Sequence, residues 1–150
     1  MNLLILRFVN IMMVDLVAGT VFAITVGFNP KTLSAPAYVE MQQLAIKSLN
    51  TLMPLLGLIT IIITFLSAFL HRNDKPVFIL LLTGAGFLII SGLITKFGNQ
   101  PINSIVMTWD KHTVPADWTS LRDHWWNLHL FRTATSIAAL GLIIYSYLKR

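Results

Sequence analysis

The sequence has no cysteine and little charge, and both absences restrict what the protein can be. Without cysteine, no disulfide, thiol nucleophile or cysteine-ligated iron–sulfur cluster can form in this chain. Only 11% of the residues are charged, whereas soluble domains carry about a quarter. An ordinary soluble domain is therefore disfavoured from the outset.

Acidic residues are the scarcer charge, with six Asp and Glu against 11 Lys and Arg and a net charge of +5. This excess does not predict nucleic-acid binding, because the basic residues lie at the edges of apolar segments and form no continuous patch. Loops of membrane proteins collect Lys and Arg in this way. We therefore expect no nucleic-acid partner.

Long apolar segments replace the missing charge, and hydrophobic residues make up 55% of the chain. Crossing the hydrocarbon core takes about 20 helical residues. Four segments meet this length, at about 3–28, 52–70, 77–95 and 130–148. We predict an all-α integral membrane four-helix bundle that forms a single domain in the lipid bilayer. The first segment is interrupted by Arg7 and Asp15, so we interpret it as a retained span and not as a signal peptide.

Two long connections, at about 29–51 and 96–129, separate the predicted spans. With four spans, both lie on one side of the membrane, and both termini lie on the other side. We expect short helices in both connections. One begins at Pro36 and packs through Val39, Leu44 and Ala45.

Basic residues close to the span ends predict the orientation. Arg7, Arg72, Lys75, Lys149 and Arg150 lie on the side of the termini. Cytoplasmic loops carry an excess of such residues. We therefore predict a multi-pass protein of the cell membrane with cytoplasmic termini.

Side chains suited to chemistry are concentrated just before the last span. Arg122, Trp125, His129 and Arg132 are spaced by three or four residues and so share a helix face, with Trp126 beside it. A tryptophan can stack on an aromatic ring, His129 can remove a proton, and Arg132 can hold the resulting oxyanion. The alternative is that these residues only anchor the protein at the membrane interface.

The preceding polar segment adds further candidates. Asn99 followed by Pro101 resembles a helix N-cap entry, after which a short helix carries Asn103. Trp109 follows this helix, and Gly19 in the first span can open room for a ligand. We thus predict His129, Arg132 and Asn103 as catalytic, and Asn99, Trp109, Trp125, Trp126, Arg122 and Gly19 as substrate-binding.

Asp15 lies inside the first span, where a carboxylate is costly. It must face the bundle interior, a partner or water. Thr64 and Thr83 lie at about the same depth and are its candidate hydrogen-bond partners.

The histidines do not predict a metal or haem site. His124 and His129 are five residues apart, whereas a helical two-histidine site needs a spacing of four. The first three spans hold no histidine that could act as an axial haem ligand. We expect no metal and no cofactor.

Four segments of the sequence carry a pattern shared with a known family: AGTVFAITVGFNP, MQQLAIKSLNTLMP, TKFGNQPINSIVMTW and DWTSLRDHWWNLHLFRT. They resemble the anthrone oxygenase-like family of small four-span membrane proteins. The shared pattern is carried by Asn99, Pro101, Asn103, Trp109, Trp125, His129 and Arg132. The resemblance implies oxidation of an anthrone to an anthraquinone without a metal or flavin, through a delocalised anion that reacts with O₂.

Two hypotheses follow for function. The first is a membrane-embedded, cofactor-free monooxygenase that removes a proton from a hydrophobic anthrone- or quinone-type molecule. The second is a non-enzymatic membrane protein that binds a lipid, a quinone or a protein partner. A transporter is disfavoured because no pair of broken helices stands out. Whether the chain forms a homo-oligomer stays open.

Overall fold

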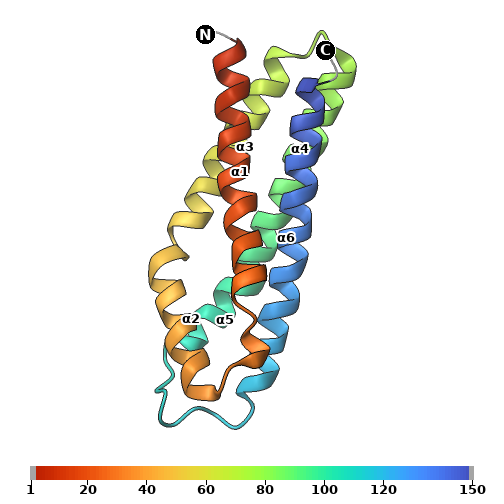
Figure 1. Ribbon diagram of the computed structural model, residues 1–150. Coiled ribbons are helices and arrows are strands. Elements are labelled where there is room, and N and C mark those ends of the chain that lie inside the picture. The colour runs from red at the N-terminus through yellow and green to blue at the C-terminus, as the bar shows by residue number, and fades with distance from the viewer. Residues whose placement is uncertain (1–2, 149–150) are drawn as a thin grey trace.

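The computed structural model describes residues 3–148, and the elements in this range are all helical (Figure 1). Four segments, containing α1, α3, α4 and α6, are long and apolar enough to cross a membrane, which confirms the predicted fold class. The elements are α1 (Leu3–Gly27), η1 (Pro30–Thr32), α2 (Ala35–Leu49), α3 (Leu52–Leu70), α4 (Lys75–Leu93), η2 (Ile94–Asn99), α5 (Gln100–Val106) and α6 (Trp118–Leu148).

The long helices form a bundle with unlike ends (Figure 1). α2 and α5 lie at one end, which we call the cap end. The start of α1, the end of α6 and the turn between α3 and α4 lie at the other, which we call the terminal end. Both long connections are thus on one side, as the even number of spans predicts.

Small residues allow α4 and α6 to pack closely in the bundle core. A Cβ atom added at Gly84 would lie 2.9 Å from Ile143 of α6. Leu81, Ala139 and Ile143 are fully buried around this contact. Membrane helices use small residues in this way, because packing and not water exclusion drives their association.

α6 is much longer than the predicted span at 130–148, since it begins at Trp118 and includes 31 residues. The helix expected to carry Arg122, Trp125, His129 and Arg132 is thus continuous with the span. The first turn of α2 contains Pro36, at a position where its missing N–H costs little. The predicted helix in this connection is therefore present.

The expected N-cap at Asn99 is wrong. Asn99 has a right-handed helical backbone and makes no side-chain cap bond, and the chain continues from α4 through η2 into α5 without a loop. η2 is a π-helix, in which the N–H of Gln100 donates to the carbonyl of Thr95. Pro101 has no N–H and its ring crowds the carbonyl four residues before it, which favours this local widening.

The packing face of α2 agrees with the prediction at Val39, which is buried, and differs from it at Leu44. Leu44 is 68% exposed, whereas Gln42 is only 1% exposed. Tyr38, Gln42 and Ile46 are spaced by four residues and form the buried row instead. A polar residue therefore occupies the inner face of α2.

Asp15 is exposed on the outer side of α1 and does not face the bundle interior. Its two expected partners are engaged elsewhere, since Thr64 donates to Asn10 at 2.8 Å and Thr83 donates to the carbonyl of Ile79 at 2.9 Å. The proposed bonds to Asp15 are thus wrong, and a partner or water is left to satisfy this carboxylate.

An Arg–His pair lies at the terminal end. Nε and Nη2 of Arg7 donate to Nε2 of His71 over 3.1 and 2.9 Å. Nδ1 of His71 donates to the carbonyl of Ser67 over 2.7 Å. Arg7 also lies 5.6 Å from the ring centre of Tyr147, whose hydroxyl accepts from Asn10.

Candidate functional site

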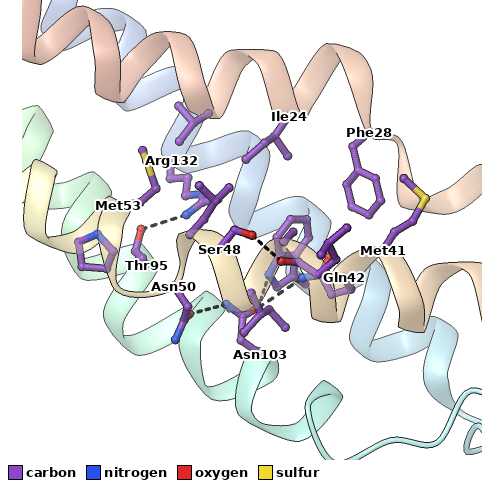
Figure 2. Close-up of a pocket in the computed structure, with 17 residues that line it drawn as sticks. Ile24, Phe28, Met41, Gln42, Ser48, Asn50, Met53, Thr95, Asn103 and Arg132 are labelled. Carbon is purple, nitrogen blue, oxygen red and sulfur yellow. Dashed lines mark hydrogen bonds between the residues drawn. The ribbon is translucent and has the colours of Figure 1, made fainter.

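A cavity of about 280 Å³, which we call cavity A, lies at the cap end between α2 and the bundle (Figure 2). Ile24 of α1 and Phe28, which follows the end of α1, form one apolar wall, and Met41 and Ala45 of α2 form another. The complete lining is Val21, Ile24, Phe28, Met41, Gln42, Leu44, Ala45, Ile46, Ser48, Leu49, Asn50, Met53, Pro54, Thr95, Asn103, Trp125 and Arg132. Such a mainly apolar cavity with a few convergent polar groups is typical of a ligand site.

The loop between α5 and α6 holds α2 in place as a wall of this cavity. Nε2 of Gln43 donates to the carbonyls of Val106 and Trp109 over 3.0 and 2.9 Å. Lys111 and Glu40 form an ion pair on the surface. This pair holds the pKa of Glu40 below its usual range and the pKa of Lys111 above it.

Asn103 connects three elements at the floor of cavity A (Figure 2). Its Nδ2 donates to Oδ1 of Asn50 over 2.9 Å. Its Oδ1 accepts from Nε1 of Trp125 over 2.9 Å and from Nε2 of Gln42 over 3.4 Å. These bonds fix the indole of Trp125 in the wall of cavity A. In the structure, Asn103 therefore positions the side chains of Trp125, Asn50 and Gln42.

His129 is fully buried behind the cavity wall and does not line cavity A. Nε and Nη2 of Arg132 lie 3.1 and 2.9 Å from its Nδ1. Because a guanidinium only donates, Nδ1 is the acceptor and the proton of the neutral ring is assigned to Nε2. Nε2 then donates to Oγ1 of Thr25 over 2.9 Å. Both ring nitrogens of His129 are thus engaged.

Two tryptophans fix the plane of the His129 ring. Trp125 stacks on it with centres 5.1 Å apart and planes 2° from parallel. Trp126 stacks at 5.4 Å and 22°. The three- and four-residue spacing along α6 therefore produces the expected grouping of Trp125, His129 and Arg132.

Arg132 presents positive charge to cavity A. Of the five N–H donors on a guanidinium, three are engaged by His129 and by Oγ1 of Thr95 at 3.4 Å. The ion pairs within residues 3–148 are Lys111–Glu40 and Arg122–Asp123, so Arg132 has no carboxylate partner there. A half-buried cation without a counter-charge costs free energy. An anionic group on a ligand would supply the missing counter-charge.

Gln42 supplies a second open polar group. Its side chain is 1% exposed and lines cavity A, and its Oε1 has no hydrogen-bond partner among the described residues. A buried carbonyl oxygen that accepts no hydrogen bond destabilises the protein. A ligand hydroxyl that donates to this oxygen would therefore bind favourably. Sequence analysis missed Gln42, Thr25 and Thr95, which lie on α2, α1 and η2, far from α6 along the chain.

The other predicted residues lie outside cavity A. Asn99 is buried and donates to the carbonyl of Trp125 over 3.1 Å. Arg122 pairs with Asp123 and lies over Trp118 at 4.8 Å. Trp109 packs in the cap, and Gly19 lies on the exposed side of α1.

The side chains that line cavity A limit the reactions that the site can support. Cavity A is lined by no carboxylate and no imidazole. Among residues 3–148 there is no group of three or more His, Cys, Asp or Glu side chains placed to hold a metal ion. What the arrangement can do is bind a flat apolar molecule against Trp125 and Phe28 and stabilise negative charge at Arg132.

The fold and the site define a class: a small helical membrane protein with a ligand-sized cavity at one end of the bundle. Within this class, the chain belongs to the anthrone oxygenase family, whose model matches residues 42–142, about two thirds of the sequence. This match includes the second half of α2, all of η2 and α5, and most of α6, which supply much of cavity A. No curated protein and no solved structure matches the chain.

Proposed function

We propose that this protein is a membrane-embedded, cofactor-free oxygenase-like enzyme that acts on a hydrophobic anthrone- or quinone-type molecule in cavity A. The observation that carries the proposal is Arg132, a cation that has no carboxylate partner among residues 3–148 and lies in the wall of a mainly apolar cavity. Membership of the anthrone oxygenase family supports the reaction type.

The proposed reaction begins with loss of a proton from the CH₂ group of an anthrone. The charge of the resulting anion is spread onto the carbonyl oxygen, where Arg132 stabilises it. The anion transfers an electron to O₂, and the two radicals combine into a peroxide anion on the same carbon. This anion takes a proton from water and becomes a hydroperoxide. Loss of water then gives the quinone. The substrate loses two hydrogens and gains one oxygen atom, and the second oxygen leaves as water.

His129 acts in this proposal through Arg132. Its acceptor nitrogen holds two donors of the guanidinium, while Thr25 fixes the opposite side of the ring. The guanidinium is thereby oriented before the ligand arrives, which lowers the reorganisation needed when charge develops. We therefore treat His129 as a positioning residue, and the proton of the substrate passes to water at the exposed side of cavity A near Leu44.

A non-enzymatic binding protein for a quinone or lipid is the second candidate. It is favoured by one observation, the absence of a carboxylate or imidazole from the lining of cavity A. Such a protein would use Arg132, Gln42 and Trp125 for recognition alone.

The test uses the protein in lipid nanodiscs with emodin anthrone as the probe. We expect oxygen uptake and quinone absorbance to rise well above the spontaneous rate, with one O₂ consumed for each quinone formed. Arg132→Gln should return the rate to the spontaneous level, and Arg72→Gln, which changes an exposed arginine of the terminal turn, is the control. Oxidation at the spontaneous rate would overturn the enzymatic proposal. Binding without oxidation would support the second candidate.

For localisation we propose the cell membrane with cytoplasmic termini. Because the chain has no cysteine, single cysteines report sidedness directly. In intact cells, a membrane-impermeant maleimide should label Thr108→Cys at the cap end and leave Asn73→Cys at the terminal end unlabelled. Both positions are exposed. The opposite labelling would reverse the orientation.

A further inference from the structure

A second cavity, which we call cavity B, adjoins cavity A and also has a volume of about 280 Å³. The two share Val21, Met53, Pro54, Thr95 and Arg132 in their linings. Arg132 therefore stands where the two cavities meet. A single ligand of sufficient length would occupy both and keep its charged group at this junction.

Cavity B extends from the cap end into the depth of the bundle. Its lining includes Lys96 and Gln100 at the cap end, and Ile61 and Leu88 further inside. From Met53 to Ile61 along α3, this is a depth of about 12 Å at the rise of an α-helix. The deeper wall is apolar, so it suits a hydrocarbon chain and not a second polar ring.

The side of cavity B faces the region that membrane lipid would occupy. Leu58 of α3 and Ile89 and Leu93 of α4 line it, and these side chains are 55%, 36% and 50% exposed. Two glycines, Gly57 and Gly92, also line it, and a Cβ atom at either would meet nothing within 4 Å. The missing side chains thus leave space between the exposed residues.

We infer that cavity B holds the hydrocarbon tail of an amphiphilic ligand, whose acidic hydroxyaromatic or hydroxyquinone ring lies in cavity A with its oxyanion on Arg132. This inference rests on the proposed function and names the substrate class of that site. The ligand enters sideways from the bilayer, and its tail follows the channel between α3 and α4. Gln42 Oε1 accepts a ring hydroxyl.

The physical argument concerns shape more than hydrophobicity. A tail gains little free energy by moving from lipid into an apolar cavity, since lipid is already apolar. The cavity instead permits the ring to reach Arg132 without bending the tail. Filling cavity B should therefore exclude tailed ligands and leave untailed ones unaffected.

The experiment compares two acidic hydroxyquinones in nanodiscs of fixed composition: 2-hydroxy-1,4-naphthoquinone and its 3-undecyl derivative. Binding is followed by quenching of tryptophan fluorescence, to which Trp125 in the wall of cavity A contributes. Gly92→Leu and Gly57→Leu fill cavity B from two helices. Gly86→Leu is the matched control, because Gly86 lies on α4, has the same open space and does not line cavity B.

We expect Gly92→Leu and Gly57→Leu each to weaken binding of the undecyl probe by at least about tenfold, the effect of forcing extra methylenes into an occupied space. The untailed probe should bind these variants and wild type within about twofold. Gly86→Leu should bind both probes as wild type does. Thermal unfolding of each variant confirms that the bundle is intact.

Two other results separate the failure of this inference from that of the proposed function. If the undecyl probe binds the filled variants as it binds wild type, cavity B holds no ligand tail, and an acyl chain of ordinary lipid occupies it; the site in cavity A then stands. If wild type binds neither probe, the ligand site in cavity A is wrong and the tail inference is overturned with it. Binding with tail selectivity but without anthrone oxidation would remove only the enzymatic step.

Discussion

The two Arg–His pairs of this protein have the same local geometry and different surroundings. At the cap end, Nε and Nη2 of Arg132 lie 3.1 and 2.9 Å from one nitrogen of His129. At the terminal end, Arg7 makes contacts of the same lengths with His71. Each histidine uses its second nitrogen to donate, to Thr25 in one case and to the carbonyl of Ser67 in the other.

The difference lies in what each arginine reaches beyond its histidine. Arg132 lines cavities A and B, while Arg7 lines neither of them and lies 5.6 Å from the ring centre of Tyr147. An Arg–His pair alone therefore does not identify a binding site. The accessible space beside the guanidinium makes one pair a candidate for chemistry, and the other a structural contact between α1 and α3.

The strongest test of this comparison changes both arginines in the same way. Arg132→Gln should lower the rate of anthrone oxidation by about 100-fold to 1,000-fold, the usual effect of losing one donor to a developing oxyanion. Arg7→Gln should leave the rate within about threefold of wild type. Oxygen uptake in nanodiscs measures both. Equal losses would mean that the two ends of the bundle are not functionally distinct.

The role of His129 can be separated from that of a base by comparing two substitutions. His129→Leu removes the acceptor for Arg132 and should lower kcat by about tenfold to 100-fold through misorientation. His129→Gln keeps an acceptor oxygen and should recover most of this loss. A base cannot be replaced by an amide, so a His129→Gln variant as inactive as His129→Leu would show that the ring itself takes the proton.

The corresponding changes at His71 provide the control for that experiment. His71→Leu leaves Arg7 without its acceptor and should lower the thermal stability of the bundle. It should not change kcat or KM, because His71 lies at the opposite end from cavity A.

Both ends also hold buried oxygens without a hydrogen-bond partner among the described residues, including Oε1 of Gln42 at the cap end and Oγ of Ser67 at the terminal end. If Gln42 awaits a ligand hydroxyl, Gln42→Leu should weaken binding of the hydroxynaphthoquinone probe by about fivefold to tenfold, the effect of one hydrogen bond. Ser67→Ala should leave binding unchanged. Equal binding by both variants would remove Gln42 from the recognition model.

The smallest effect is expected at Tyr38, whose hydroxyl is buried without a partner among the described residues and lines neither cavity A nor cavity B. Burial raises the pKa of Tyr38 to about 12, opposed weakly by the charge of Arg122. The unfolded chain then loses this proton near pH 10 while the folded protein keeps it. Stability is therefore fully present below pH 10 and falls as the pH rises toward 12.

Tyr38→Phe should raise the free energy of unfolding by about 1 kcal/mol at neutral pH, because it removes an unsatisfied hydroxyl. Its advantage over wild type should grow between pH 10 and pH 12. Unfolding by sodium dodecyl sulfate at several pH values measures both effects. A loss of stability at neutral pH would mean that the hydroxyl has a partner, such as water.

The parts of the molecule that sequence analysis predicted depend on local pattern. The spans follow from uninterrupted apolar segments, and the grouping of Trp125, His129 and Arg132 follows from helical spacing. The rest depends on contacts between distant segments. Thr25 is 104 residues from His129 along the chain, and no local pattern predicts that pair.

Polarity was a misleading guide at two positions. Gln42 is buried because α2 presents the row of Tyr38, Gln42 and Ile46 to the cap, while Leu44 is exposed. Asp15, which was expected to face the bundle interior, a partner or water, is exposed on the outer side of α1. In a membrane protein, the outer surface need not be polar and the inner surface of a ligand site need not be apolar, so hydropathy alone does not assign a face.

The π-helix between α4 and α5 has a consequence for the register of the cap. A π-turn is equivalent to one residue inserted into an α-helix, and one residue corresponds to a rotation of about 100°. Deleting a single residue within Ile94–Asn99 would restore a regular α-helix and leave the membrane span itself unchanged. It would also turn Asn99 and Asn103 away from Trp125 and open the floor of cavity A. The direction in which the cap faces is thus set by one extra residue in a helix that otherwise continues unbroken from the membrane.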